Sequence, residues 1–153
     1  MSDRARRVHE HSRSLLRSAG VWRCRELDHI CAAVEQHTGR QLVRSATHLD
    51  AATVHGAVVR TADIDYVIVE SQTSPDHQQH ILLHELGHLL CDHSDQAHGL
   101  LTRSTYTDPL EYEAEVIASL LGQHLRRAAD PLHLQPVDPQ VHRLLDSFGL
   151  LGR

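Results

Sequence analysis

Residues 74–92 read Ser-Pro-Asp-His-Gln-Gln-His-Ile-Leu-Leu-His-Glu-Leu-Gly-His-Leu-Leu-Cys-Asp, and the predicted fold is built around this segment. Ser74 suits a helix N-cap, Pro75 suits the first helical position and Asp76 suits the first turn. We therefore predict a helix that runs to about residue 92. Four of its leucines fall on one face and give the helix a side that packs on a core. They are Leu82, Leu86, Leu89 and Leu90.

The opposite face of this helix carries a His-Glu-x-x-His motif. His84 and His88 lie one turn apart, about 40° from each other, so both imidazoles can bind one Zn²⁺. Glu85 lies about 100° from His84, which suits a general base for an attacking water rather than a ligand. By chance alone the motif would occur about 0.07 times in a chain this rich in histidine, so its context matters. Gly87 costs helix propensity and indicates that another element approaches closely there.

A catalytic zinc site needs a third protein ligand and one open position. Residues 111–115, Glu-Tyr-Glu-Ala-Glu, lie in a second predicted helix of residues 108–127. We assign Glu111 as the third ligand. Glu115 lies one turn further on the same face, and we assign it as the acceptor that orients a zinc-bound histidine through its other ring nitrogen. The alternative is that Asp108 and Glu111 form an N-terminal capping box, which requires no metal.

The remaining segments predict an α+β fold. Apolar residues at helical spacing indicate two helices before residue 40, which end at Gly20 and Gly39, and a last helix that begins at Asp138. Short β-branched runs predict three strands, at residues 41–44, 54–60 and 66–70. We expect one zincin-like domain with a small antiparallel three-stranded sheet, packed on the His-Glu-x-x-His helix, and helices on either side. The third strand is expected to offer an edge to an extended substrate.

Composition restricts the class of protein. The chain has 153 residues, of which 41% are hydrophobic and 23% charged, so it is expected to fold as a globular domain. Its apolar runs are too short to cross a bilayer, so no membrane association is expected. No apolar segment follows Met1, and three cysteines are too few for a disulfide framework. A cytoplasmic protein is therefore expected.

Charge is distributed unevenly along the chain. Residues 1–25 have a formal charge of +5 and the remaining residues −10, which together give the net charge of −5. We predict a basic N-terminal helical arm of residues 1–22 and a zinc metallopeptidase-like domain of residues 23–153. A basic arm on an acidic body can contact nucleic acid or an acidic partner, and the alternative is an ordinary solvated helix. Direct nucleic-acid binding is not expected, because the body is acidic and no recognition motif is present.

Two segments resemble the ImmA/IrrE-type metallopeptidases, which are gluzincin-like zinc proteins. Residues 79–90, QHILLHELGHLL, and 111–118, EYEAEVIA, match a family pattern similar to His-Glu-Leu-Gly-His followed by Glu-x-Glu-Ala-(Asn/Asp)-x-Phe-Ala. The resemblance covers about residues 50–125. Glu115 replaces the usual Asn or Asp, which lengthens that side chain by one methylene. Ile117 replaces the common Phe, which changes the packing.

The resemblance implies a cytoplasmic endopeptidase that cleaves a helix-turn-helix transcriptional repressor and so releases the regulated genes. In that interpretation Zn²⁺ binds to His84, His88 and Glu111, and Glu85 is the general base. Tyr106, just before the second motif, is the candidate donor to the oxyanion. The alternative is a non-catalytic, zinc-stabilised regulator that binds a partner, although such a protein would not need Glu85. The sequence does not indicate an oligomeric state.

Overall fold

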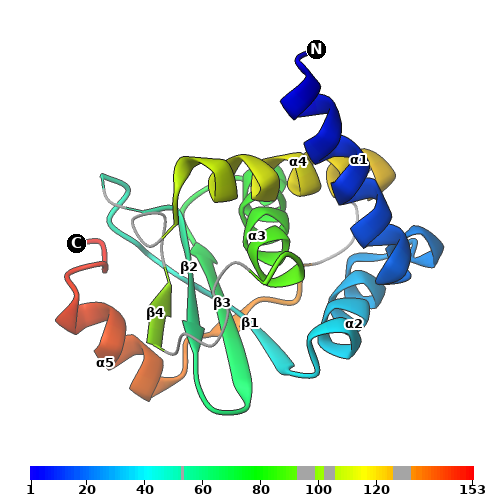
Figure 1. Cartoon of the computed structure of the whole chain (residues 1–153). Helices are drawn as coiled ribbons and strands as arrows, with labels where there is room; N and C mark the ends of the chain where they lie inside the picture. The colour runs from blue at the N-terminus through cyan, green and yellow to red at the C-terminus, as the bar shows by residue number, and fades with distance from the viewer. Residues whose placement is uncertain (53, 93–98, 102–105, 126–131) are drawn as a thin grey trace.

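A mixed sheet with helices on both faces makes up the described part of the chain, which is residues 1–52, 54–92, 99–101, 106–125 and 132–153 of a computed structural model (Figure 1). The helices are α1 Asp3–Ser18, α2 Leu27–Thr38, α3 Pro75–Leu90, α4 Asp108–Leu125 and α5 Pro139–Ser147, with a short 3₁₀ turn, η1, at Val21–Arg23. The strands are β1 Gln41–Thr47, β2 Gly56–Arg60, β3 Ile64–Glu70, β4 Gly99–Leu101 and β5 Gln135–Pro136. The predicted α+β class is confirmed.

The sheet has the strand order β4-β2-β3-β1-β5. β2 and β3 pair antiparallel, as predicted, with Val58 opposite Val67, but β1 runs parallel to β3. The predicted antiparallel three-stranded sheet is therefore wrong in one strand direction and in strand number. The periodicity of two that identifies a strand contains no information about its direction. β3 is central rather than an edge, so the substrate edge expected at residues 66–70 is wrong as well.

The two strands that the prediction lacks are very short. β4 pairs antiparallel with β2, and β5 pairs parallel with β1 through two residues. Neither strand is long enough to show an alternating pattern. The helix predicted for residues 108–127 corresponds to α4, and its predicted end at residue 127 lies outside the described residues.

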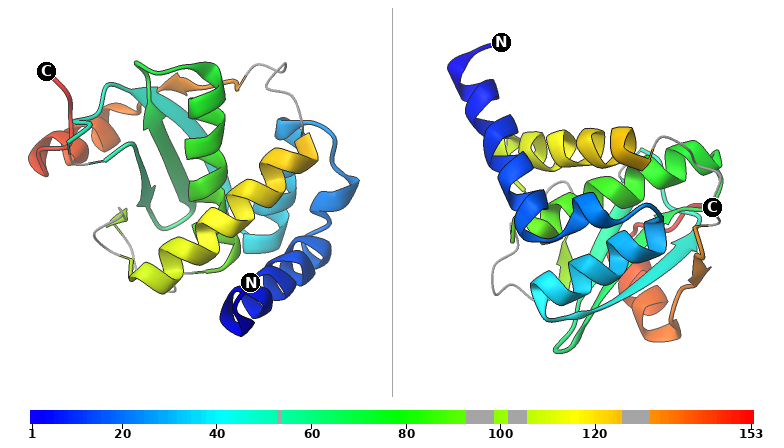
Figure 2. Two further views of the ribbon diagram at one scale, coloured as in Figure 1. Left: turned by 90° about the horizontal axis from the view of Figure 1, so that it is seen from above. Right: turned by 90° about the vertical axis from the view of Figure 1, so that its right-hand side faces the viewer.

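Alternate residues of the central strands pack into two separate cores. Val58 and Val67 face α3 and belong to the main core, which also receives residues of α1, α2 and α4. Val59 and Ile68 point to the other face and pack against Val141 and other residues of α5 and the C-terminal segment. Figure 2 shows α5 on one side of the sheet and α3, α4 and α1 on the other. This alternation follows from the strand period of two.

The N-terminal helix is partly integrated into the main core. Ser2 caps α1 by accepting a hydrogen bond from the backbone of Ala5, and Gly20 follows the helix with a φ of 75°. Leu16 and Val21 are fully buried among residues of the main core, whereas the first turns extend beyond the body (Figure 1). The division into an arm of residues 1–22 and a domain of residues 23–153 stays a prediction.

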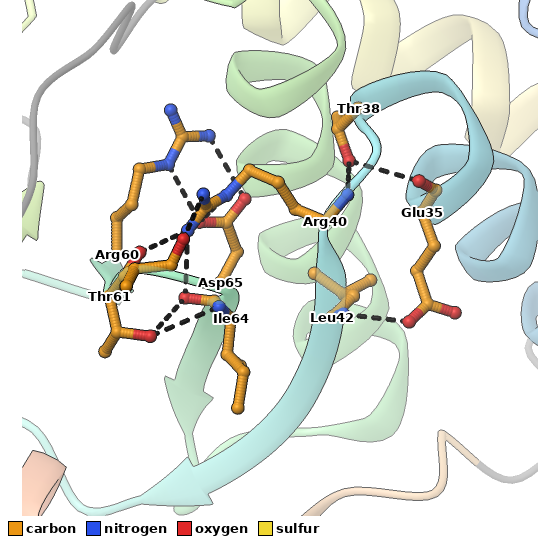
Figure 3. A network of polar contacts seen from close by, with 9 residues as sticks. Glu35, Thr38, Arg40, Leu42, Arg60, Thr61, Ile64 and Asp65 are labelled. Atoms are coloured by element: carbon orange, nitrogen blue, oxygen red, sulfur yellow. Dashed lines mark hydrogen bonds and ion pairs between the residues drawn. The ribbon is translucent and has the colours of Figure 1, made fainter.

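A buried ionic network fixes the end of the sheet near the β2–β3 turn (Figure 3). Arg60 donates two hydrogen bonds to the carboxylate of Asp65, at 2.8 and 3.1 Å, and Arg40 donates a third at 3.1 Å. Arg40 also donates to the backbone carbonyls of Thr61, Ala62 and Ile64. Bidentate Arg–carboxylate geometry makes these charge-assisted bonds strong, so the turn is held against the start of β1.

A second buried carboxylate fixes the opposite end of β3. Glu70 accepts hydrogen bonds from Nδ1 of His48 and from the backbone N–H of Leu49, both at 3.0 Å. The chain that leaves β1 is therefore attached to the sheet at residues 48 and 49. The C-terminal segment pairs with residues 48–50, because the backbone N–H of Asp50 donates to the carbonyl of Leu150 and the backbone N–H of Gly152 donates to the carbonyl of His48.

Within the described residues, none of the helices combines the length and the apolar character that crossing a membrane requires.

Candidate metal centre

The helix α3 begins as the sequence predicts. The hydroxyl of Ser74 accepts a hydrogen bond from the backbone N–H of His77 at 3.2 Å, and Pro75 occupies the first helical turn. Leu82, Leu86 and Leu89 are buried at 2% exposure or less, which directs the His84 and His88 side of the helix toward α4.

α3 and α4 approach closely at Gly87. A Cβ atom on this residue would lie 2.9 Å from the carbonyl oxygen of Ala114 and 3.0 Å from its Cα. Any side chain at this position would therefore force the two helices apart, which explains a glycine in the middle of a helix. Glu111 lies one turn before Ala114, so the close approach brings its carboxylate to the two histidines.

The three predicted ligands converge on one point. Nε2 of His84 and Nε2 of His88 each lie 3.0 Å from a carboxylate oxygen of Glu111, and 3.2 Å from each other. Ligand atoms at about 2.0–2.1 Å from a tetrahedral zinc ion lie roughly 3.3 Å apart. Two imidazoles and one carboxylate are also a donor set that zinc enzymes use. The residues therefore fit Zn²⁺, and the side chain of Glu111 faces the histidines rather than capping its own helix.

Glu85 lies beside this point in a buried position. The side chain is 7% exposed, and its Oε2 atom has no hydrogen-bond partner among the described residues. Burial raises the pKa of Glu85 to about 8, with a further contribution from the negative charge of Glu111. A carboxylate with this pKa is a stronger base than one in water, which suits proton transfer near neutral pH.

Gly56, at the start of β2, passes directly over Glu85. A Cβ atom on Gly56 would lie 3.1 Å from Oε1 of Glu85 and 2.6 Å from Cγ2 of Ile81. Sequence reasoning did not identify this residue. The only signal was a glycine at the head of a β-branched run, which indicates close backbone approach without naming the neighbour.

Glu115 extends the site away from the three ligands. Its Oε2 atom lies 3.0 Å from Nδ1 of His84, on the ring nitrogen opposite the one that faces Glu111. This arrangement is the one that we expected of an acceptor that orients a ligand, and carboxylates commonly hold metal-binding histidines in this way.

Tyr106 packs flat against His88. The ring centroids are 3.7 Å apart with an interplanar angle of 8°, and the tyrosine is 8% exposed. Burial raises the pKa of Tyr106, and the negative charge of Glu85 raises it further. Its role as the oxyanion donor stays a prediction. The tyrosine that lines the cleft in the described residues is Tyr112, which sequence reasoning did not select.

A cleft of about 540 Å³ opens beside the metal-binding point. One wall is formed by α4, the second by the exposed face of α3, and the third by the segment before β2. The cleft is lined in part by Ala52, His55, His77, His80 and Tyr112. Its size suits a peptide segment with one or two side chains.

Comparison with known families identifies the chain. The family model described as IrrE N-terminal-like domain matches residues 39–122, which is more than half of the chain. The chain belongs to this family. The matched segment contains both helices that contribute to the site, and the family is a peptidase family, which supports a metallopeptidase-type function. Neither the curated proteins nor the solved structures gave a match.

Proposed function

We propose that the chain is a cytoplasmic, zinc-dependent endopeptidase whose substrate is a helix-turn-helix transcriptional repressor, so that cleavage releases the regulated genes. The observation that carries the enzymatic part is the convergence of His84, His88 and Glu111 beside the buried carboxylate of Glu85. A site that only stabilised the fold would not need that fourth residue. The repressor as substrate rests on the resemblance to the ImmA/IrrE-type metallopeptidases alone.

Each residue of the site has a chemical role in this proposal. His84, His88 and Glu111 would hold the metal and leave one position open. Zinc, when bound, would lower the pKa of the attacking water and polarise the scissile carbonyl. Glu85 would accept the proton of that water and then donate it to the leaving amine. Tyr106 remains the proposed donor to the oxyanion, and Tyr112 is a second candidate because it lines the cleft.

The decisive experiment compares the wild-type protein with Glu85→Gln. Zinc-loaded protein is incubated with a helix-turn-helix protein encoded by a neighbouring reading frame, and the products are identified by mass spectrometry. We expect one zinc ion per chain in both proteins and a loss of cleavage of at least ~10²-fold in the variant, which is the low end for general acid–base catalysis. Equal cleavage rates would refute the assigned mechanism.

Two further outcomes separate the metal site from the reaction. A double variant, His84→Ala with His88→Ala, is expected to lose tight zinc binding, and full retention by elemental analysis would refute the metal site. If wild type and Glu85→Gln both bind the repressor and neither cleaves it, the alternative of a zinc-stabilised regulator replaces the peptidase.

A further inference from the structure

Glu115 makes a second contact that the metal site alone does not explain. Its Oε2 atom lies 3.0 Å from Nδ1 of His84, and its Oε1 atom lies 3.0 Å from Nε2 of His80. His80 lies one turn before His84 on the same face of α3 and lines the cleft. One carboxylate from α4 therefore bridges two histidines of α3.

The length of Glu115 makes this bridge possible. A carboxylate one methylene shorter would be drawn back toward α4 by about one C–C bond length, roughly 1.5 Å, and would lose the 3.0 Å contacts with both histidines. The side chain of Glu115 is 50% exposed, so by itself it would sample several rotamers in water. The contact of its Oε1 atom with Nε2 of His80, at 3.0 Å, limits this freedom and fixes the oxygen that faces His84.

The orientation of that oxygen determines how His84 presents its ring. A neutral imidazole carries one N–H group, and a carboxylate beside Nδ1 favours the tautomer with the proton on that nitrogen. Nε2 of His84 then has a lone pair that faces Glu111 and His88. The contact between His80 and Glu115 thus acts, through one intermediate residue, on the metal-binding nitrogen.

We propose that His80 is a positioning residue, which holds Glu115 in the orientation that receives the Nδ1–H group of His84 and so keeps Nε2 of His84 available for the metal. This inference rests on the metal site of the proposed function, but it does not depend on peptide cleavage. His80 would thus have a role in the site although it is neither a metal ligand nor the general base.

The test measures zinc affinity by competition with a chromophoric chelator in the full-length chain. Replacement of residues that orient metal ligands typically costs 10–100-fold in affinity, and we expect such a loss for Glu115→Ala. We expect His80→Ala, which leaves the carboxylate in place, to lose about 3–10-fold, which is at or below the lower end of that range. His80→Gln retains an N–H donor and is expected to restore most of the loss.

A matched control comes from the preceding turn. His77 also lines the cleft, but its Nδ1 atom is hydrogen-bonded to the hydroxyl of Thr73 at 2.8 Å rather than to Glu115. His77→Ala is therefore expected to leave zinc affinity unchanged. In a Glu115→Ala background, His80→Ala is expected to have no further effect, because the residue through which it acts is missing.

The outcomes distinguish this inference from the proposed function. Unchanged affinity in His80→Ala, an equal loss in His77→Ala, or the same loss of affinity with and without Glu115 would each overturn it. Absence of tight zinc binding in the wild type would instead overturn the metal site. Because His80 is 46% exposed, the melting temperature of the metal-free variant is expected to match that of the wild type.

Discussion

Glu85→Gln should make the metal-free protein more stable, with a dependence on pH that can be worked out in advance. Burial and the charge of Glu111 raise the pKa of Glu85 from its ordinary value of 4.5 to about 8. The folded state therefore keeps a proton that the unfolded state loses, and stability falls as the pH rises from about 4.5 to 8. Each pH unit in that interval costs about 1.4 kcal/mol, or about 3 kcal/mol in total at pH 7. The neutral glutamine does not incur this cost.

Urea unfolding in the presence of a chelator, at several pH values between 5 and 9, measures this effect. The unfolding free energy of Glu85→Gln minus that of the wild type should grow by about 1.4 kcal/mol per pH unit and level off above pH 8. Glu10→Gln, on the exposed side of α1, is the control for removal of one carboxylate. Zinc should reduce the difference, because a nearby dication favours the ionised carboxylate. A difference that stays constant across this pH range would show that the pKa of Glu85 is not raised in the folded protein.

Three further predictions concern packing and acid stability. Gly87→Ala should destabilise the protein by about 1–3 kcal/mol and weaken zinc binding. Gly122→Ala should be tolerated, because a Cβ there would lie 3.9 Å from its nearest neighbour. Urea unfolding of the two variants measures the difference. Burial alone raises the pKa of Glu70, but hydrogen bonds from His48 and two backbone N–H groups outweigh it and lower the pKa overall. Glu70→Gln should therefore destabilise the protein at pH 7, and this difference should shrink as the pH falls below about 4; an unchanged difference at pH 3 would contradict the assignment. Leu16→Ala should cost about 2–5 kcal/mol by thermal or urea unfolding, because the side chain is fully buried, and a negligible cost would show that α1 is peripheral.

The helices could be predicted from sequence because their ends have local chemical causes. Ser74, Gly39 and Asp138 stop or start helices through their own side chains or backbone, without help from distant residues. The ligand assignment had a similar basis, since spacing along a helix determines which residues share a face. Glu111 and Glu115 share a face of α4, and the structure brings that face to His84.

The remaining features depend on contacts between distant segments. β1 pairs in parallel with β3, and residues 48–50, which follow β1, are held by Glu70 and by the C-terminal residues. The contact of Gly56 with Glu85 and the stacking of Tyr106 on His88 likewise join residues from different elements. Periodicity and capping report only on neighbours along the chain, so neither could have revealed these contacts.

The hydrogen bonds between the C-terminal residues and residues 48–50 affect how the choice of substrate can change. Ala52 and His55, a few residues further along, line one wall of the cleft. Leu150 and Gly152 form backbone hydrogen bonds with Asp50 and His48, just before that wall. Leu150 and Gly152 lie about 60 positions along the chain after His88, the last metal ligand in α3. Substitutions there can alter the width of the cleft while every ligand stays in place. A mutational scan restricted to the two motif helices would therefore overlook part of what determines which peptides fit.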